Sequence, residues 1–157
     1  MEIDAFLADS VAVAEGKLYA QGVGWNVIHT AVLPVRHDRI GIGAIVRVPY
    51  TATNQKHTFS VYLTGSSNND PLPLADAPPG VETPDGKIRR FGGQFNVGRP
   101  PTVQPGDEQL VPVGINIDGL EFDEADSYQF VIELDGTKVK ELRFRISQVI
   151  QPEPVFE

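Results

Sequence analysis

The sequence predicts an all-β protein, built as an antiparallel β-sandwich of about eight strands in an immunoglobulin-like or jelly-roll-like arrangement. Apolar and polar residues alternate with a period of two in several short segments, whereas no segment of useful length has apolar residues at helical spacing. Turn-forming residues, including 15 glycines and 13 prolines, separate these segments. With 157 residues, of which 41% are hydrophobic, the chain can bury the core of one domain.

The strands are expected in a regular succession along the chain. The first two flank a turn at Glu15-Gly16, and a Gly92-Gly93 pair in a later one indicates a bulge or bend. Pro112 indicates a sheet edge or a bulge, because proline cannot donate a hydrogen bond to a neighbouring strand. The expected strands lie within residues 4–13, 17–28, 40–48, 59–63, 87–97 and 110–117, and the last two form a hairpin within residues 126–146.

The closing hairpin raises a question of register. A two-residue turn at Asp135-Gly136 would place the apolar residues of its two strands on opposite faces. A three-residue loop, 134–136, with Gly136 as a left-handed bulge would restore one apolar face. The sequence therefore predicts that Tyr128 lies opposite Leu142, and Glu133 opposite Thr137.

Composition excludes several classes of partner. The net charge is −8, so clustered phosphates of nucleic acids and anionic membrane surfaces are unfavourable partners. There is no cysteine, and no apolar run is long enough to cross a membrane.

The first residues are acidic, unlike a signal peptide. The expected location is cytoplasmic, or a particle assembled from the cytosol, and no cofactor is predicted.

Two extended segments favour contact with a protein partner. Residues 1–150 are expected to form a single domain that carries a proline-rich arm at 65–86, and residues 151–157 an extended tail. The arm's Leu72 and Leu74 and the tail's Val155 and Phe156 are candidate partner-binding residues. Docking of these segments on a neighbouring subunit is one hypothesis, and folding back over the chain's own sheet is the other.

One acidic stretch is a candidate calcium site. Asp118, Glu121, Asp123 and Asp126 lie in one connection, and calcium prefers clustered oxygen ligands on flexible loops. The spacing does not fit an EF-hand, and such corners often only cap a turn and keep an edge soluble. The histidines at 29, 37 and 57 have unrelated spacings and are interpreted as surface groups.

Two stretches resemble an uncharacterised family of short all-β proteins encoded by bacteria and phages. The first is ADSVAVAEGKLYAQGVGWNVI, Ala8 to Ile28, and the second is GLEFDEADSYQFVIELDG, Gly119 to Gly136. The second is also similar to the last strands of immunoglobulin-like sandwiches. The resemblance implies a fold but assigns no functional residue.

The sequence favours a non-enzymatic function. The expected role is a protein-protein interaction or assembly module, such as a structural component of a phage particle or a similar complex, with either a homo-oligomer or another protein as partner. A calcium- or ligand-binding module is the first alternative. An enzyme with an unrecognised carboxylate site is the second.

Overall fold

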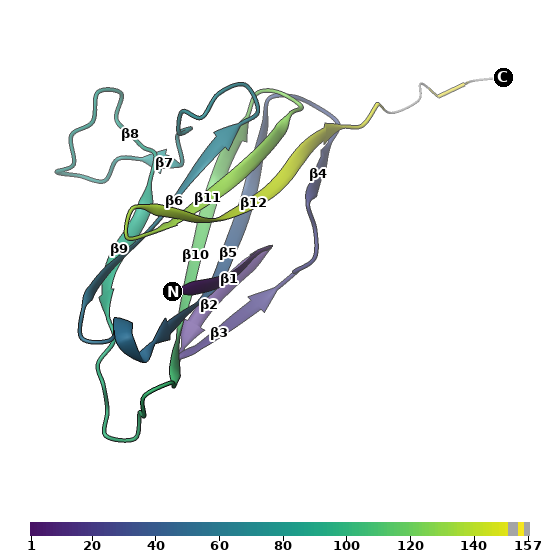
Figure 1. The fold of residues 1–157 in the computed structure, drawn as a ribbon. Helices are drawn as coiled ribbons and strands as arrows, with labels where there is room; N and C mark the ends of the chain where they lie inside the picture. Colours follow the sequence, from purple (N-terminus) through teal and green to yellow (C-terminus); the bar gives the residue numbers. More distant parts are fainter. Residues whose placement is uncertain (151–153, 156–157) are drawn as a thin grey trace.

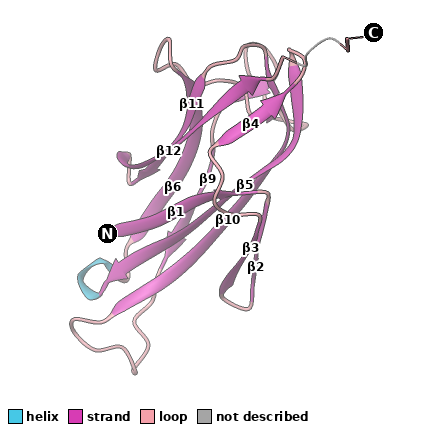
Figure 2. Ribbon diagram, turned by 90° about the vertical axis from the view of Figure 1, so that its right-hand side faces the viewer, coloured by secondary structure: helices cyan, strands magenta, loops and turns pink. Residues whose placement is uncertain are grey.

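The computed structural model describes residues 1–150 and 154–155, and within them the chain is all-β, as predicted. Figure 2 shows strands throughout, with one short 3₁₀ turn at Tyr50–Ala52. The described residues form twelve strands, against the eight expected. They are β1 Glu2–Ala8, β2 Ser10–Ala14, β3 Lys17–Gln21, β4 Val27–Thr30, β5 Val35–Pro49, β6 Lys56–Gly65, β7 Ala75–Asp76, β8 Lys87–Ile88, β9 Phe91–Asn96, β10 Glu108–Phe122, β11 Ser127–Leu134 and β12 Thr137–Gln148.

Two larger sheets contribute to one hydrophobic core. The three-stranded sheet has the order β1-β5-β10, and the five-stranded sheet has the order β4-β12-β11-β6-β9 (Figure 1). Buried residues from both sheets, such as Ile42 of β5 and Phe130 of β11, belong to one cluster. Among the described residues, every strand pair is antiparallel except β4 with β12, which is parallel. The two remaining sheets are the two-stranded ribbons β2-β3 and β7-β8.

The turn and the register of the closing hairpin differ from the prediction. Asp135 and Gly136 both have positive φ, 51° and 77°, and form a two-residue turn in which Leu134 lies opposite Thr137. Further along the hairpin, the register shifts by one residue between Ile132 and Glu133. This shift returns the apolar residues of the two strands to the same face. The predicted loop and pairs are therefore wrong, and Tyr128 lies opposite Phe144. The predicted apolar face is nevertheless correct, because one extra residue in β12 has the same effect on parity as one in the turn.

The first predicted strand is divided between two sheets. After β1, the chain leaves the three-stranded sheet at Asp9, whose backbone N–H donates to carbonyls of residues 21 and 22, and continues as β2. The β2-β3 ribbon lies against β5 and β10 where these strands carry glycine. A Cβ atom at Gly41 would lie 3.2 Å from the Ser10 backbone, and one at Gly114 would lie 3.3 Å from Val11. The missing side chains let the ribbon approach closely.

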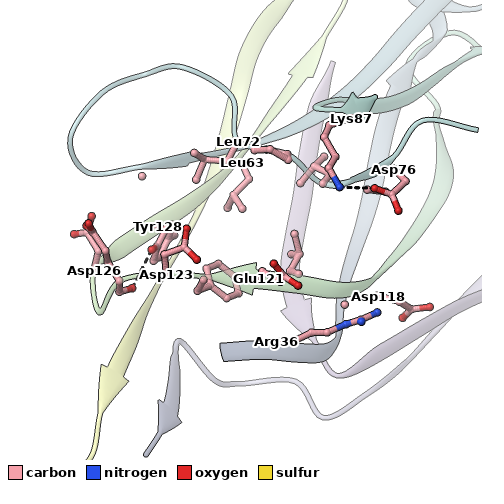
Figure 3. A pocket seen from close by; sticks show the side chains of 18 of the residues that line it. Arg36, Leu63, Leu72, Asp76, Lys87, Asp118, Glu121, Asp123, Asp126 and Tyr128 are labelled. Atoms are coloured by element: carbon pink, nitrogen blue, oxygen red, sulfur yellow. Dashed lines mark hydrogen bonds and ion pairs between the residues drawn. The ribbon is translucent and has the colours of Figure 1, made fainter. Parts of the chain in front are cut away.

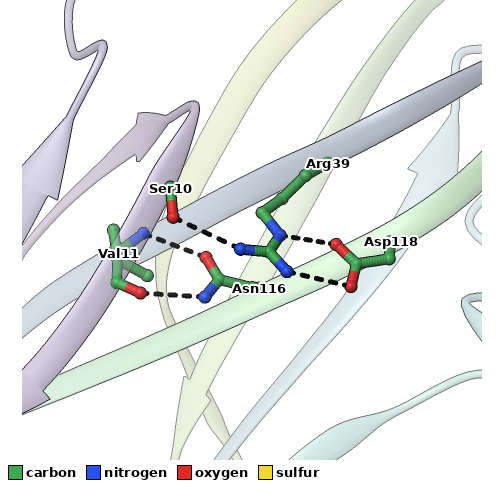
Figure 4. Close-up of polar contacts among 5 residues, drawn as sticks. All are labelled: Ser10, Val11, Arg39, Asn116 and Asp118. Atoms are coloured by element: carbon green, nitrogen blue, oxygen red, sulfur yellow. Dashed lines mark hydrogen bonds and ion pairs between the residues drawn. The ribbon is translucent and has the colours of Figure 1, made fainter.

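Asn116 of β10 binds this ribbon through its side chain. Its Oδ1 accepts from the Val11 N–H at 2.9 Å, and its Nδ2 donates to the Val11 carbonyl at 2.8 Å (Figure 4). Beside it, the Arg39 guanidinium contacts both Asp118 oxygens, at 2.6 and 3.2 Å, and reaches Ser10 Oγ at 3.4 Å. The side chain of Asn116 therefore takes the place of a neighbouring strand for Val11.

Replacing Asn116 with leucine is expected to lower the free energy of unfolding by about 1–2 kcal/mol, because both backbone groups of the buried Val11 lose their partner. Urea denaturation followed by circular dichroism measures the change. Asn96→Leu, on exposed β9, is the matched control and should change stability by less than about 0.5 kcal/mol. Equal effects of the two substitutions would contradict the role given to Asn116.

Two segments extend away from the two-sheet body. The β7-β8 ribbon and its loop project at the upper left of Figure 1, and β12 ends at the upper right, followed by residues 149 and 150. Val149 is still tied to the body through its N–H, which donates to the Thr30 carbonyl at 2.7 Å, whereas Ile150 is 88% exposed. None of the helices in the described part of the chain is long and apolar enough to cross a membrane.

Candidate functional site

The arm and the acidic stretch, predicted as separate sites, form the two walls of one cleft. Its volume is about 700 Å³. Residues 118–126 at the end of β10 and in the following turn line one side, and residues 72–76 of the arm line the other (Figure 3). Arg36 of β5 and Lys87 of β8 complete the lining with the end of β6. The cleft is thus assembled from segments that lie far apart in the sequence.

The floor of the cleft is apolar and its rim is acidic. The buried side chains of Leu63, Leu74, Leu120 and Phe122 form the floor. Six carboxylates and two cationic side chains belong to the lining, so its formal charge is −4. The carboxylates are those of Asp76, Asp118, Glu121, Asp123, Glu124 and Asp126. Such a surface favours a ligand that combines positive charge with an apolar part.

The arm's leucines pack on the chain's own core. Leu74 is 3% exposed, and its N–H donates to the Ile88 carbonyl at 2.8 Å. Leu72 is half-buried against the core, and its N–H donates to the Leu63 carbonyl at 2.8 Å. Partner binding by these two residues stays a prediction, and the structure shows them packed on the chain's own body. Their side chains escape water in the floor of the cleft, as the alternative hypothesis of a folded-back arm expected.

Hydrogen bonds fix several of the rim's charges. Asp76 and Lys87 form an ion pair across the β7-β8 ribbon, and this contact lowers the pKa of Asp76 and raises that of Lys87. The Asp126 carboxylate accepts from Ser66 Oγ at 2.6 Å and from the Ser127 N–H at 2.7 Å, which lowers its pKa. These groups therefore stay charged at neutral pH.

Tyr128 connects the apolar floor with the acidic turn. Its hydroxyl donates to the Glu124 carbonyl at 3.0 Å, and its ring packs edge-on against Phe122 with 4.9 Å between centroids. Burial raises the pKa of the Tyr128 phenol, and neighbouring carboxylates add to the effect. Tyr128 is therefore a neutral hydrogen-bond donor that holds the turn in place.

Arg36 is the second cation of the cleft and lies over a glycine. A Cβ atom at Gly119 would lie 2.6 Å from Arg36 Nη2, and Gly119 has a φ of +69°. This position favours glycine because of its backbone angle, whereas the guanidinium is the far end of a flexible side chain. In Figure 3 no hydrogen bond or ion pair joins Arg36, Glu121 or Asp123 to the other side chains drawn.

The four predicted calcium ligands all line the cleft but do not surround one point. Asp118 is held by Arg39, which lowers its pKa, and Asp126 is held by Ser66 and Ser127. Glu121 and Asp123 lie along the wall between them (Figure 3). Within residues 1–150 and 154–155, no three His, Cys, Asp or Glu side chains form a group that could hold a metal ion. The calcium hypothesis gains no ligand set from this geometry.

Comparison with known proteins assigns a family. The model of DUF6941, a family of unknown function, matches residues 3–147. The chain belongs to this family. The match agrees with the resemblance to an uncharacterised family and also covers residues 29–118, between the two stretches that showed it.

Other comparisons add little to the DUF6941 assignment. No curated protein matches the sequence. Among solved structures, the chain is similar to a Pseudomonas fluorescens alkylpurine DNA glycosylase, AlkC, bound to DNA containing an abasic site analogue. The TM-score is 0.41 with 11% identity, and the match covers 91% of this chain and 30% of that chain. A likeness of this size supports no functional argument.

The DUF6941 chain also contains a buried histidine that the sequence did not reveal. The prediction of a surface group is wrong for His57, which is 5% exposed. Its Nδ1 lies 2.8 Å from Asp135 Oδ2 and its Nε2 lies 2.7 Å from the Ala52 carbonyl oxygen. Both neighbours accept hydrogen bonds, so the ring satisfies both only when it carries two protons. His57 and Asp135 are 78 residues apart in the sequence, so no local pattern could predict that they form a pair.

The tail residues of this DUF6941 chain are described only in part. Val155 is 88% exposed, whereas Phe156 lies outside the described residues. Sequence reasoning also missed Arg36, Asp76 and Lys87 of the cleft. Their positions depend on how the arm folds, and nothing in their immediate sequence indicates that they meet.

Proposed function

We propose that this protein is a non-enzymatic interaction module whose cleft binds a basic, partly apolar segment of a partner protein. The observation that supports the proposal most is the combination of an acidic rim and an apolar floor in one cleft. A lysine or arginine side chain can place its charge at the rim and its aliphatic stem on the floor. Complementary charge then speeds association and selects the partner.

The protonation of the cleft supports binding rather than catalysis. General-acid catalysis by a carboxyl group needs a pKa raised toward neutral pH. Hydrogen-bond donors instead lower the pKa values of Asp76, Asp118 and Asp126. Such carboxylates are suited to attract a cation and remain ionised while it is bound.

We place the domain among immunoglobulin-like or jelly-roll-like sandwiches, supported by two sheets of three and five strands that share one core. A structural component of a phage particle or a similar complex, made in the cytosol of a bacterial host, would use such a module to hold a partner.

The proposal is tested with charged peptides. A fluorescein-labelled Lys-Leu-Lys-Leu-Lys-Leu peptide should bind the full chain in fluorescence anisotropy, more weakly at high salt, while the Glu-Leu counterpart should not bind. The double variant Glu121→Lys with Asp123→Lys should weaken binding about tenfold, since two rim charges are reversed.

Glu2→Lys with Glu15→Lys is the matched control. Both residues are exposed and lie outside the cleft lining, and the double variant makes the same change in net charge. This control should weaken binding less than about twofold. If both double variants weaken binding equally, the peptide responds only to overall charge, and the cleft is not the binding site.

A further inference from the structure

A second surface, independent of the acidic cleft, is an apolar groove between the free edges of the two sheets. Its volume is about 570 Å³, and β9 lines one side and β10 the other. No charged residue belongs to the lining. The apolar side chains that line it include those of Phe91, Phe95, Val111, Val113 and Ile115, with Val13 of the β2-β3 ribbon at one end.

Both strands beside the groove have an unpaired edge. Among the described residues, β9 pairs only with β6, and β10 pairs only with β5. The free edge of β10 carries Pro112, as the sequence predicted for an edge position. An extended segment in the groove could add to one of these edges and bury its apolar face at the same time.

The groove has a socket at Gly93. A Cβ atom at this position would have no heavy atom within 4 Å, in contrast to Gly92, where it would lie 2.2 Å from the Phe59 carbonyl oxygen. Gly93 lies between Phe91 and Phe95 in β9, and these three positions are on the same face of the strand. The open space there is bordered by two aromatic rings and suits a third.

The chain's own C-terminal segment has a sequence that fits such a groove. In residues 150–157, IQPEPVFE, the side chains of Ile150, Pro152, Pro154 and Phe156 would share one face of an extended strand. The opposite face would be mostly polar. Both prolines would lack an N–H on the same edge, so the strand could pair through its other edge only.

The segment cannot take this position in its own molecule. Pairing registers place Phe144 level with Gly65, and Phe91 level with Val61. The distance from the end of β12 to the start of the groove at Phe91 therefore has two parts. It is about 27 Å along the strands and about 14 Å across three strand spacings, which makes a straight-line distance of about 30 Å. Residues 149–157 span at most about 30 Å, so the whole segment would be used in reaching the groove. Figure 1 also shows β12 ending on the side away from β9.

We infer that the groove between β9 and β10 binds the C-terminal segment of a second copy of this chain, with Phe156 in the socket at Gly93. In such a contact, one subunit contributes its C-terminal segment and the other contributes its groove, so the two surfaces differ. Repetition of the contact therefore gives rings or open chains of subunits.

The test uses a fluorescein-labelled peptide of residues 149–157, with full-chain Phe156→Asp as the receptor so that self-association does not compete. The peptide should bind, and a Phe156→Asp peptide should bind at least tenfold more weakly. Gly93→Phe in the receptor should also weaken binding at least tenfold, because its own ring fills the socket. Gly98→Phe is the matched control, since it has equal space but lies outside the groove, and should bind normally.

Sedimentation velocity of the unmodified chain gives a second readout. The weight-average sedimentation coefficient should rise with concentration, and either Phe156→Asp or Gly93→Phe should abolish the rise. Absence of peptide binding together with a concentration-independent monomer overturns the inference. Peptide binding that Gly93→Phe leaves unchanged also overturns it, because the segment would then bind elsewhere.

Discussion

Replacing Phe130 with alanine is expected to lower the free energy of unfolding by about 4 kcal/mol, since a large core side chain would be replaced by a cavity. Phe130 lies in β11 at the centre of the five-stranded sheet and is fully buried. Its ring is stacked on that of Phe144, with 5.5 Å between centroids and 21° between planes. The loss therefore includes both apolar burial and an aromatic pair.

Urea denaturation of the full chain measures this change as a lower midpoint with an unchanged slope. Tyr19→Ala is the control, because Tyr19 is an aromatic residue of a strand but is 55% exposed. Tyr19→Ala should lower the free energy of unfolding by less than about 1 kcal/mol. A loss below about 1 kcal/mol for Phe130→Ala would show that the core does not close over this side chain.

His57→Phe is expected to lower stability by about 2 kcal/mol at pH 5.5 and by less at pH 9. The value is at the low end for a buried ion pair because the Asp135 side chain is 45% exposed. The substitution keeps a ring against Phe95 but leaves the Ala52 carbonyl and the Oδ2 atom of Asp135 without the histidine donor. Asp135 stands in the β11-β12 turn and also accepts from the Thr58 N–H at 2.9 Å, so the pair ties that turn to β6.

The pH dependence follows from the direction of each pKa shift. Hydrogen bonds to the Ala52 carbonyl and to Asp135 raise the pKa of His57, so its stabilisation is complete below the unfolded value of 6.5 and disappears as pH rises through the folded-state pKa. Hydrogen bonds from Thr58 and His57 lower the pKa of Asp135, so its contribution is present above its unfolded value of 3.8 and disappears as pH falls through the folded-state pKa. The pair therefore stabilises the fold most between these limits.

Stability of the unmodified chain and of His57→Phe, compared from pH 4 to pH 9, tests this account, with exposed His29→Phe as control. Titration of the His57 ring by NMR should give a pKa above 6.5. A pKa below that value, or a difference in stability that grows toward pH 9, would contradict the doubly protonated ring.

Much of the fold could be predicted because local alternation determines which residues face the core. The apolar face of the closing hairpin was correct even though its loop was wrong, since a bulge and a longer turn have the same effect on parity. The length of β5 was not predictable in the same way. Its first part, VRHDR, is polar, and it becomes a strand by pairing with residues 118–122 across Gly119.

The candidate site was predictable only in pieces. The acidic stretch and the arm are both evident in the sequence, because charge and proline content are local properties. That they form one cleft depends on Leu72 and Leu74 folding onto the body, which no local pattern decides. The ion pair of Asp76 with Lys87 appears only after the β7-β8 ribbon has formed.

Amide NMR of the full chain shows whether the acidic cleft binds a basic segment of a partner protein. The Lys-Leu peptide is titrated into the ¹⁵N-labelled full chain, and shift changes are mapped by residue. If the peptide binds in the cleft, the largest changes are expected at residues 118–126, 72–76 and 87, which line it. Changes confined to other surfaces, or none at saturating peptide, would contradict binding in the cleft.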